Sequence, residues 1–567
     1  MSSAMKQVKH DSGYYALIHG FSDGIKVIVV GCKSEELKPR LCFAVNDIKK
    51  FIQDFPKIFN SFFKAIIFNV MNCSNAANPD NIKIRHQLKE KVEKLKIPYY
   101  FITCETFFAS LSLAVSKYTC DIGDIIFIPI ISENFICSYA YRREADGYIN
   151  IRQRAVFKDE IGDEKTFRAA FYADYDPKKI ITFSICPNSI MLKRLRKIVD
   201  PRKVTFMERN DKDDIKFLVE ICKWLFNPKS NNACYIKPRS AKRFYASPFD
   251  RFNIDTATIV VEYNEELPLN RKYLFPRTIS QLFLTYSLGE PNPVLKYYKT
   301  CTPDTTPACH RYELNFSIDL NNFPKTVIKN VMIPQIESLP SMLDKAMKDR
   351  HPVIGFFDNS SVICVYNEKD GKYEFLESWN GIYGKDIFLD LKPKRPVLEY
   401  KPPNDTKSVI TFNELCAFTE SQPPPSLNRG LQLVKKSEKD LSLIFETFNG
   451  QQISSTPSFL MALILKEHYM AIKKETGIRH DKIGIHFFPI YRDPTKVEEA
   501  KDAVQGYAFE FIKTMQTKHE IQILLKESCN LLRVQYCADA SKALEAIPFT
   551  LDDSKILVMP PSVLENL

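Results

Sequence analysis

The sequence predicts an α/β protein in which a β-sandwich lies between two α/β regions. Three observations lead to this fold class. Short apolar strands alternate with helical stretches in residues 1–238. Extended segments separated by proline and asparagine fill residues 239–335, and the alternation returns in residues 336–567. We call these parts region one, the sandwich and region three.

Region one shows the alternation most clearly. Strands are predicted at Ile25–Val30, Ala65–Val70, Tyr99–Thr103, Ile125–Ile131 and Ile180–Ile185. Apolar residues at helical spacing predict helices at Ile82–Leu95 and Met191–Val199. Strands that alternate with helices favour a largely parallel sheet.

The middle of the chain lacks long helical patterns. Its extended segments are Thr258–Tyr263, Gln281–Tyr286 and Tyr312–Leu320. This pattern predicts a compact antiparallel β domain. A short helix at Ile336–Lys348 then leads into region three.

Region three resembles region one in its order of elements. Its strands are predicted at Val353–Phe357, Ser361–Tyr366, Ile483–Phe488 and Leu531–Tyr536, and its helices at Ser458–Lys474 and Thr495–Met515. In both regions an apolar strand, a charged helix and a second strand precede a short acidic step and another helix. The two regions therefore look like distant repeats.

Composition excludes several classes of protein. No apolar stretch is long enough to cross a membrane, and the first residues lack the apolar core of a signal peptide. The 15 cysteines form no CxxC pair, so we expect reduced thiols, no metal site and a cytoplasmic location. The net charge is +11, but the basic residues are dispersed, which argues against a nucleic-acid partner.

Glycine is scarce. The chain has 17 glycines among 567 residues, well below the average usage of about 7%. Loops that hold phosphate usually need glycine, because it lets backbone N–H groups approach the anion. This composition argues against a working nucleotide site.

Several segments resemble the seventy-kilodalton heat-shock chaperones, which belong to the actin-like ATPase superfamily. Leu269–Arg277 and Phe283–Tyr286 are similar to a strand, turn and strand of their peptide-binding sandwich, and Leu314–Asn321 to its late hairpin. Val353–Ser361 looks like their opening phosphate loop. Pro489–Asp493 and Asp539–Ser541 resemble steps that follow later core strands.

The resemblance implies an actin-like, ribonuclease-H-like fold in region one and a partial second copy, its first lobe, in region three. Region one is short for a complete ATPase domain, so we expect part of its second lobe to be missing. The vestigial nucleotide-binding residues implied by the resemblance are Gly20, Ser22, Asp358, Asn359, Ser360, Ser361 and Asp539.

The residues that bind metal and phosphate in the second phosphate loop of the family are replaced in this chain. The matching stretch is Phe127–Glu133, in which Ile128 replaces the metal-side aspartate and Ile130, Ile131 and Ser132 replace three glycines. Isoleucine cannot coordinate Mg²⁺ and does not readily adopt the backbone angles of a glycine loop. We therefore expect no catalytic residue and no cofactor.

The leading hypothesis is a chaperone-like protein that does not use nucleotide and that binds polypeptide or acts as a scaffold. Unfolded polypeptide or a partner protein would be its partner, and neither nucleic acid nor membrane. Ile279, Leu282 and Leu284 would line a peptide groove if the sandwich is open. The alternatives are an ATP-dependent chaperone with an atypical site, which would need Mg-ATP, and an interaction module without a groove.

Overall fold

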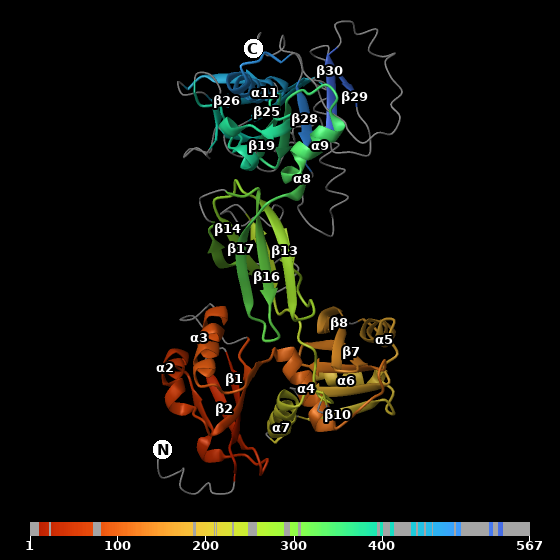
Figure 1. The fold of residues 1–567 in the computed structure, drawn as a ribbon. Helices are drawn as coiled ribbons and strands as arrows, with labels where there is room; N and C mark the ends of the chain where they lie inside the picture. The colour runs from red at the N-terminus through yellow and green to blue at the C-terminus, as the bar shows by residue number, and fades with distance from the viewer. Residues whose placement is uncertain are drawn as a thin grey trace.

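The computed structural model consists of three tiers, with region one at one end, the sandwich in the middle and region three at the other end (Figure 1). It describes residues 11–488 apart from gaps, the longest of which are 72–80, 248–257, 288–294, 401–408 and 416–431. Beyond residue 488 it describes two strands, Ile521–Leu524 and Leu531–Tyr536. The helix predicted at Thr495–Met515 lies outside the described residues. The α/β fold class is confirmed.

The first lobe of region one contains a five-stranded sheet in the order β3-β2-β1-β4-β5. Strands β1 and β2 are antiparallel, whereas β1, β4 and β5 run parallel. The elements are β1 (Tyr14–Gly20), β2 (Ile25–Gly31), β3 (Phe43–Val45), α2 (Ile48–Ile58), β4 (Phe63–Asn69), α3 (Asn81–Lys94) and β5 (Tyr99–Phe101).

The second lobe repeats this arrangement. Its sheet has the order β10-β9-β6-β7-β8, which is the first order read from the other edge. The elements are β6 (Ile125–Ile131), β7 (Phe135–Glu144), β8 (Gly147–Phe157), α5 (Glu164–Tyr172), β9 (Lys179–Ser184), α6 (Ile190–Ile198) and β10 (Val204–Glu208). The expectation of an incomplete second lobe is wrong, because all five strands are present.

Two helices lie between the lobes, and each follows one lobe in the chain but packs on the other. Helix α4 (Cys104–Ser116) follows the first lobe but packs on β6 and β9 of the second. Helix α7 (Asp213–Phe226) follows the second lobe but packs on β1, β2 and β4 of the first, and the two helices contact each other. Nine of the α4 residues are buried, as expected for a helix that is apolar on most sides. The lobes therefore share one continuous core.

The sandwich contains a four-stranded sheet in the order β12-β11-β14-β15 and a three-stranded sheet in the order β13-β16-β17. Inner residues of both sheets form one core. The strands are β11 (Arg243–Ser247), β12 (Thr258–Val261), β13 (Leu269–Pro276), β14 (Leu282–Ser287), β15 (Lys296–Cys301), β16 (Arg311–Ile318) and β17 (Pro324–Val331).

The main sheet of region three repeats the strand pairing of the two lobes except at the edge formed by β29 and β30. Strand β18 pairs antiparallel with β19 and parallel with β28, as in the two lobes, but β30 pairs antiparallel with β28. The main sheet consists of β18 (Val353–Phe357), β19 (Ser360–Asn367), β20 (Lys372–Phe375), β21 (Lys385–Asp386), β28 (Gly484–Phe487), β29 (Ile521–Leu524) and β30 (Leu531–Tyr536).

Helices cover both faces of this sheet. Helices α8 (Pro334–Glu337) and α9 (Leu339–Ala346) pack on one face, and α11 (Pro457–Thr476) packs on the other. Two small sheets complete the region: β22 (Phe388–Asp390), β23 (Val397–Glu399) and β24 (Val409–Thr411), and β25 (Gln432–Ser437), β26 (Asp440–Glu446) and β27 (Gln452–Ser455).

Candidate functional site

The hairpin predicted as a phosphate loop in region three is a contact with the sandwich. Asp358 stands in the tight turn between β18 and β19, with φ 48°, and is 4% exposed. Its two carboxylate oxygens accept hydrogen bonds from Arg311 on β16, at 2.6 Å from Nε and 3.0 Å from Nη2. This two-pronged geometry is typical of strong arginine–carboxylate pairs.

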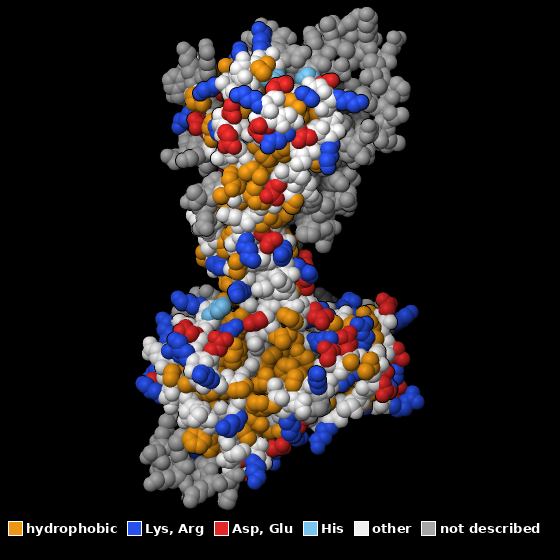
Figure 2. Space-filling view, in the orientation of Figure 1, with side chains coloured by type: hydrophobic (Ala, Val, Ile, Leu, Met, Phe, Trp, Pro, Cys, Tyr) orange, Lys and Arg blue, Asp and Glu red, His pale blue; other side chains and the backbone are white. Residues whose placement is uncertain are grey.

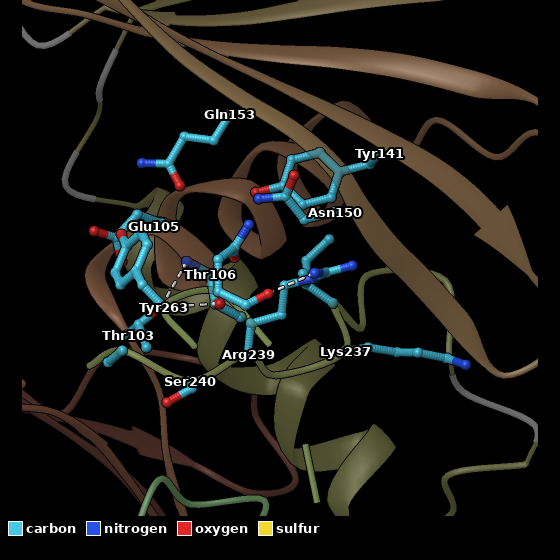
Figure 3. Close-up of a pocket in the computed structure, with 13 residues that line it drawn as sticks. Thr103, Glu105, Thr106, Tyr141, Asn150, Gln153, Lys237, Arg239, Ser240 and Tyr263 are labelled. Atoms are coloured by element: carbon cyan, nitrogen blue, oxygen red, sulfur yellow. Dashed lines mark hydrogen bonds between the residues drawn. The ribbon is translucent and has the colours of Figure 1, made fainter. Parts of the chain in front are cut away.

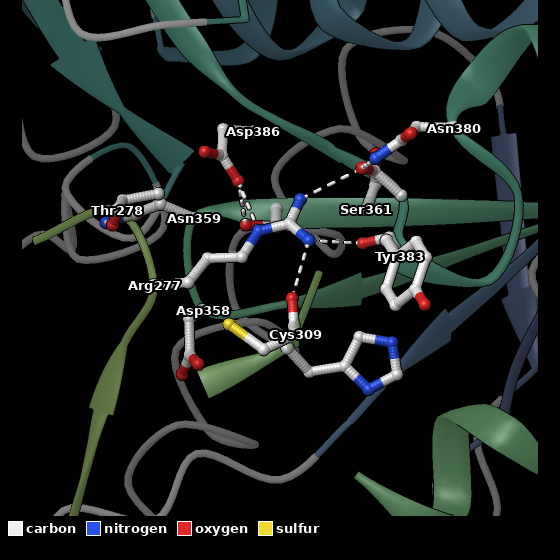
Figure 4. Close-up of polar contacts among 12 residues, drawn as sticks. Arg277, Thr278, Cys309, Asp358, Asn359, Ser361, Asn380, Tyr383 and Asp386 are labelled. Carbon is white, nitrogen blue, oxygen red and sulfur yellow. Dashed lines mark hydrogen bonds and ion pairs between the residues drawn. The ribbon is translucent and has the colours of Figure 1, made fainter. Parts of the chain in front are cut away.

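Arg277, at the end of β13, makes the second connection (Figure 4). Its Nε lies 2.6 Å from an Asp386 carboxylate oxygen, and the carbonyls of Cys309, Tyr383 and Gly384 accept from its two terminal nitrogens. Ser360 donates to the same Asp386 oxygen at 2.8 Å. The sandwich and region three thus meet through a buried polar network.

The remaining predicted side chains of this hairpin also have protein partners. The Asn359 amide lies 3.5 Å from the Thr278 hydroxyl. The Ser361 hydroxyl accepts from Trp379 Nε1 at 2.9 Å and lies 2.7 Å from His468 Nε2. Because His468 Nδ1 lies 2.6 Å from the Ile464 carbonyl, Nδ1 carries the proton and Ser361 donates to Nε2. Burial lowers the pKa of His468 to about 4, which keeps this ring neutral.

In region one, Gly20 and the isoleucines of the second predicted phosphate loop lie on strands. Gly20 ends β1 opposite Ile25, and Ser22, like Asp539 near the C-terminus, lies outside the described residues. Ile128, Ile130 and Ile131 belong to β6 and are at most 8% exposed. Ile131 pairs with Ile136 on β7, so the strand continues where the family has its glycine loop.

The predicted peptide-binding residues lie in the sandwich core. Leu282 is 2% exposed and Leu284 is fully buried, and Ile279 packs against the same cluster. Among the described residues, both sheets surround Leu282 and Leu284, so these leucines stabilise the sandwich and do not line an open groove, contrary to the expectation. Ile279 is half-buried against the same core.

A small polar cavity lies where α4 begins, between the second lobe and the segment that leads into the sandwich (Figure 3). Thr103 caps α4, with its hydroxyl accepting from the Thr106 N–H at 3.2 Å. Glu105, Asn150 and Arg239 also line the cavity. Its volume is about 30 Å³, well below the roughly 300–1,000 Å³ of typical small-ligand sites.

Charged and phenolic groups around the cavity are held by the protein itself. Arg239 donates to the Asn264 carbonyl at 2.6 Å, and burial lowers its pKa. Burial raises the pKa of Tyr263, and nearby Glu105 raises it further. This arrangement suits an internal water and does not present a nucleophile and base. Glu105 and Thr106 lie in the short acidic step that follows the second strand of the proposed repeat, and no sequence motif marks the other lining residues.

The described part of the chain holds no group of three or more His, Cys, Asp or Glu residues arranged to bind a metal ion. None of its helices combines the length and apolar character needed to cross a membrane.

The chain matches no family model and no curated protein. Among solved structures it is similar to YeaZ from Pseudomonas aeruginosa, with 7% identity and a TM-score of 0.22, over 39% of this chain and 97% of that one. A Bacteroides thetaiotaomicron protein with an actin-like ATPase fold and unknown function gives 8% identity and a TM-score of 0.22, over 36% and 96%. Likenesses at this TM-score carry no argument about function.

Proposed function

We propose that this protein is a chaperone-like scaffold that works without nucleotide. The observation that carries the proposal is the ion pair between Arg311 and Asp358. In an actin-like ATPase, the hairpin that holds Asp358 would face phosphate. Here its acid, its amide and both serines bind protein groups, so none is left for a ligand.

The other end of the sandwich supports the same proposal. The hairpin between β16 and β17 docks on the first lobe, where Arg85 is 1% exposed and its Nη2 donates to the carbonyls of Asn321 at 3.1 Å and Asn322 at 2.5 Å. The Asn321 side chain accepts from the Phe101 N–H at 2.8 Å. Buried arginines therefore fasten the sandwich at both ends, which suits a rigid spacer better than a moving clamp.

The assignment to the heat-shock chaperone class rests on the sequence segments described above and on the order of regions. Two lobes of equal strand order precede the sandwich, and a partial third lobe follows it. We infer an actin-like origin for all three lobes, a cytoplasmic location and a partner protein or unfolded polypeptide as the bound molecule. Since Leu282 and Leu284 are core residues, such a partner would bind elsewhere on the surface.

The proposal can be tested with two spin labels, at exposed Lys57 in region one and exposed Lys369 in region three. A rigid scaffold should give one narrow distance distribution that Mg-ATP does not change. The melting temperature should also show no rise with Mg-ATP that EDTA abolishes, because a ligand that binds only the native state must raise it. A distance that shifts with Mg-ATP, together with a rise in melting temperature that EDTA abolishes, would favour the ATP-dependent alternative.

A further inference from the structure

The second lobe carries a surface cleft of about 450 Å³ that no step of the proposed function uses. It lies between α5, the turn that follows α5, and the turn between α6 and β10. Its size is within the range of small-ligand sites and far exceeds that of the polar cavity at α4. The lining residues are Lys165, Arg168, Ala169, Tyr172, Ala173, Tyr175, Asp176, Asp200 and Lys203.

The shape of the cleft follows from its small and aromatic residues. Ala169 and Ala173 are four residues apart and leave room for a flat group, with Tyr172 and Tyr175 beside them. Arg152 fixes this end of α5, because its guanidinium donates to the carbonyls of Ala170, Phe171 and Tyr172. These hydrogen bonds fix the backbone at the end of α5, next to both tyrosines.

The charges favour an anion. Asp200 is neutralised by Arg202, which contacts both carboxylate oxygens, and Asp176 is neutralised by Lys203 at 2.6 Å. Among the described residues, neither Lys165 nor Arg168 forms an ion pair. Two positive charges therefore remain at one end of the cleft, on a side of region one where Figure 2 shows basic and acidic side chains together.

Arg168 is held in place for binding. Its guanidinium lies 5.0 Å from the centre of the Tyr172 ring, and one terminal nitrogen donates to the Ile198 carbonyl at the end of α6. Its other N–H groups can still serve a ligand, and arginine binds phosphate oxygens in a two-pronged manner. Lys165, which is exposed on the preceding turn of α5, adds a point charge.

We propose that this cleft binds a small phosphate monoester that carries a flat ring. Arg168 and Lys165 would bind the phosphate, and the ring would lie over the two alanines against Tyr172 and Tyr175. The inference is independent of the scaffold proposal, since it uses a different lobe surface and needs no contact between regions.

Calorimetric titration of the full chain with phenyl phosphate tests the proposal, with inorganic phosphate as the second ligand. We expect saturable binding with Kd of about 1 mM or below, and affinity for inorganic phosphate at least about tenfold lower. Lys165→Glu should weaken phenyl phosphate binding about tenfold or more, because it replaces an attraction by a repulsion. Lys193→Glu on α6 makes the same charge change outside the cleft and should leave the affinity unchanged.

Unchanged melting temperatures would show that both variants are folded. Equal weakening by Lys165→Glu and Lys193→Glu would mean a general charge effect and would overturn the site. Equal affinity for both ligands would overturn the ring contact, and the absence of saturable binding in the natural protein would overturn the whole proposal.

Discussion

Arg311 and Asp358 join the sandwich to region three through two hydrogen bonds between side chains that are 2% and 3% exposed. Removing one partner of a buried pair leaves the other charge without compensation. The turn also restricts which residue types fit at this position, because Asp358 has a positive φ. Charge and backbone conformation can therefore be tested separately at one position.

Substitution of Asp358 should destabilise the protein in two steps. Asp358→Asn keeps a residue type that tolerates a positive φ and removes the charge, and we expect a loss of about 3–5 kcal/mol in the free energy of unfolding. Asp358→Ala should cost more, because it also strains the turn. Urea denaturation measures both. A loss below about 1 kcal/mol for both variants would show that the Arg311–Asp358 pair does not stabilise the contact between the sandwich and region three.

Asn322 should stabilise the joint at the other end of the sandwich. It has φ 61° and lies in the turn between β16 and β17. Its side chain accepts from the Ala241 N–H at 2.9 Å and donates to the Arg239 carbonyl at 3.1 Å. Asn322→Gly keeps the turn but loses both bonds, so we expect a loss of about 1–3 kcal/mol in thermal or urea denaturation. A neutral result would show that the two bonds are not maintained in solution.

The leucines of the predicted groove should behave as core residues. Leu284→Ala should destabilise the sandwich by about 2–5 kcal/mol, and Leu284→Asp should prevent it from folding. Val327, which is 39% exposed on β17, offers the matched control, since Val327→Asp should be nearly neutral. Circular dichroism during urea denaturation makes the comparison. A Leu284→Asp protein that folds but has lost polypeptide binding would support the peptide-groove hypothesis.

Acid should destabilise region three and its contact with the sandwich. Burial lowers the pKa of His310 to about 4, that of His468 to about 4 and that of His486 to about 3, whereas an unfolded histidine titrates near 6.5. Between these values the unfolded chain binds more protons than the folded one, so stability falls as pH falls from about 6.5 to 4. Each histidine contributes at most about 1.4 kcal/mol per pH unit.

The variant His468→Gln tests this assignment, because glutamine does not titrate and can still accept from Ser361. The slope of unfolding free energy against pH should become shallower by one proton between pH 4 and 6.5. An unchanged slope would mean that His468 titrates alike in the folded and the unfolded protein.

Strands with continuous apolar runs were predictable from the sequence. The prediction for Val353–Phe357 coincides with β18, and Ile125–Ile131 coincides with β6. Strands β7 and β8 were missed, since charged residues occupy the end of β7 (Arg142, Arg143 and Glu144) and β8 carries Arg152 and Arg154. The repeat inside region one was also missed, because it is visible in the sheet order and not in shared motifs.

The site was less predictable than the fold. Asp358 was singled out as a vestigial nucleotide-binding residue, but its partner Arg311 lies 47 positions away and no local pattern connects them. The same holds for Arg277 and Asp386, which are 109 positions apart. Pairings of this kind depend on how two regions dock, and a single sequence holds no periodic signal for docking.

The exchange of α4 and α7 between the lobes sets the order in which the chain can mature during synthesis. When α4 leaves the ribosome, the strands β6 and β9 that it covers have not yet been made. One apolar face of the first sheet likewise stays uncovered until α7 has left the ribosome. We expect neither half of region one to fold alone, and cuts for shorter versions of the protein belong after Ile236, because Cys234, Tyr235 and Ile236 still pack in the core that the two lobes share.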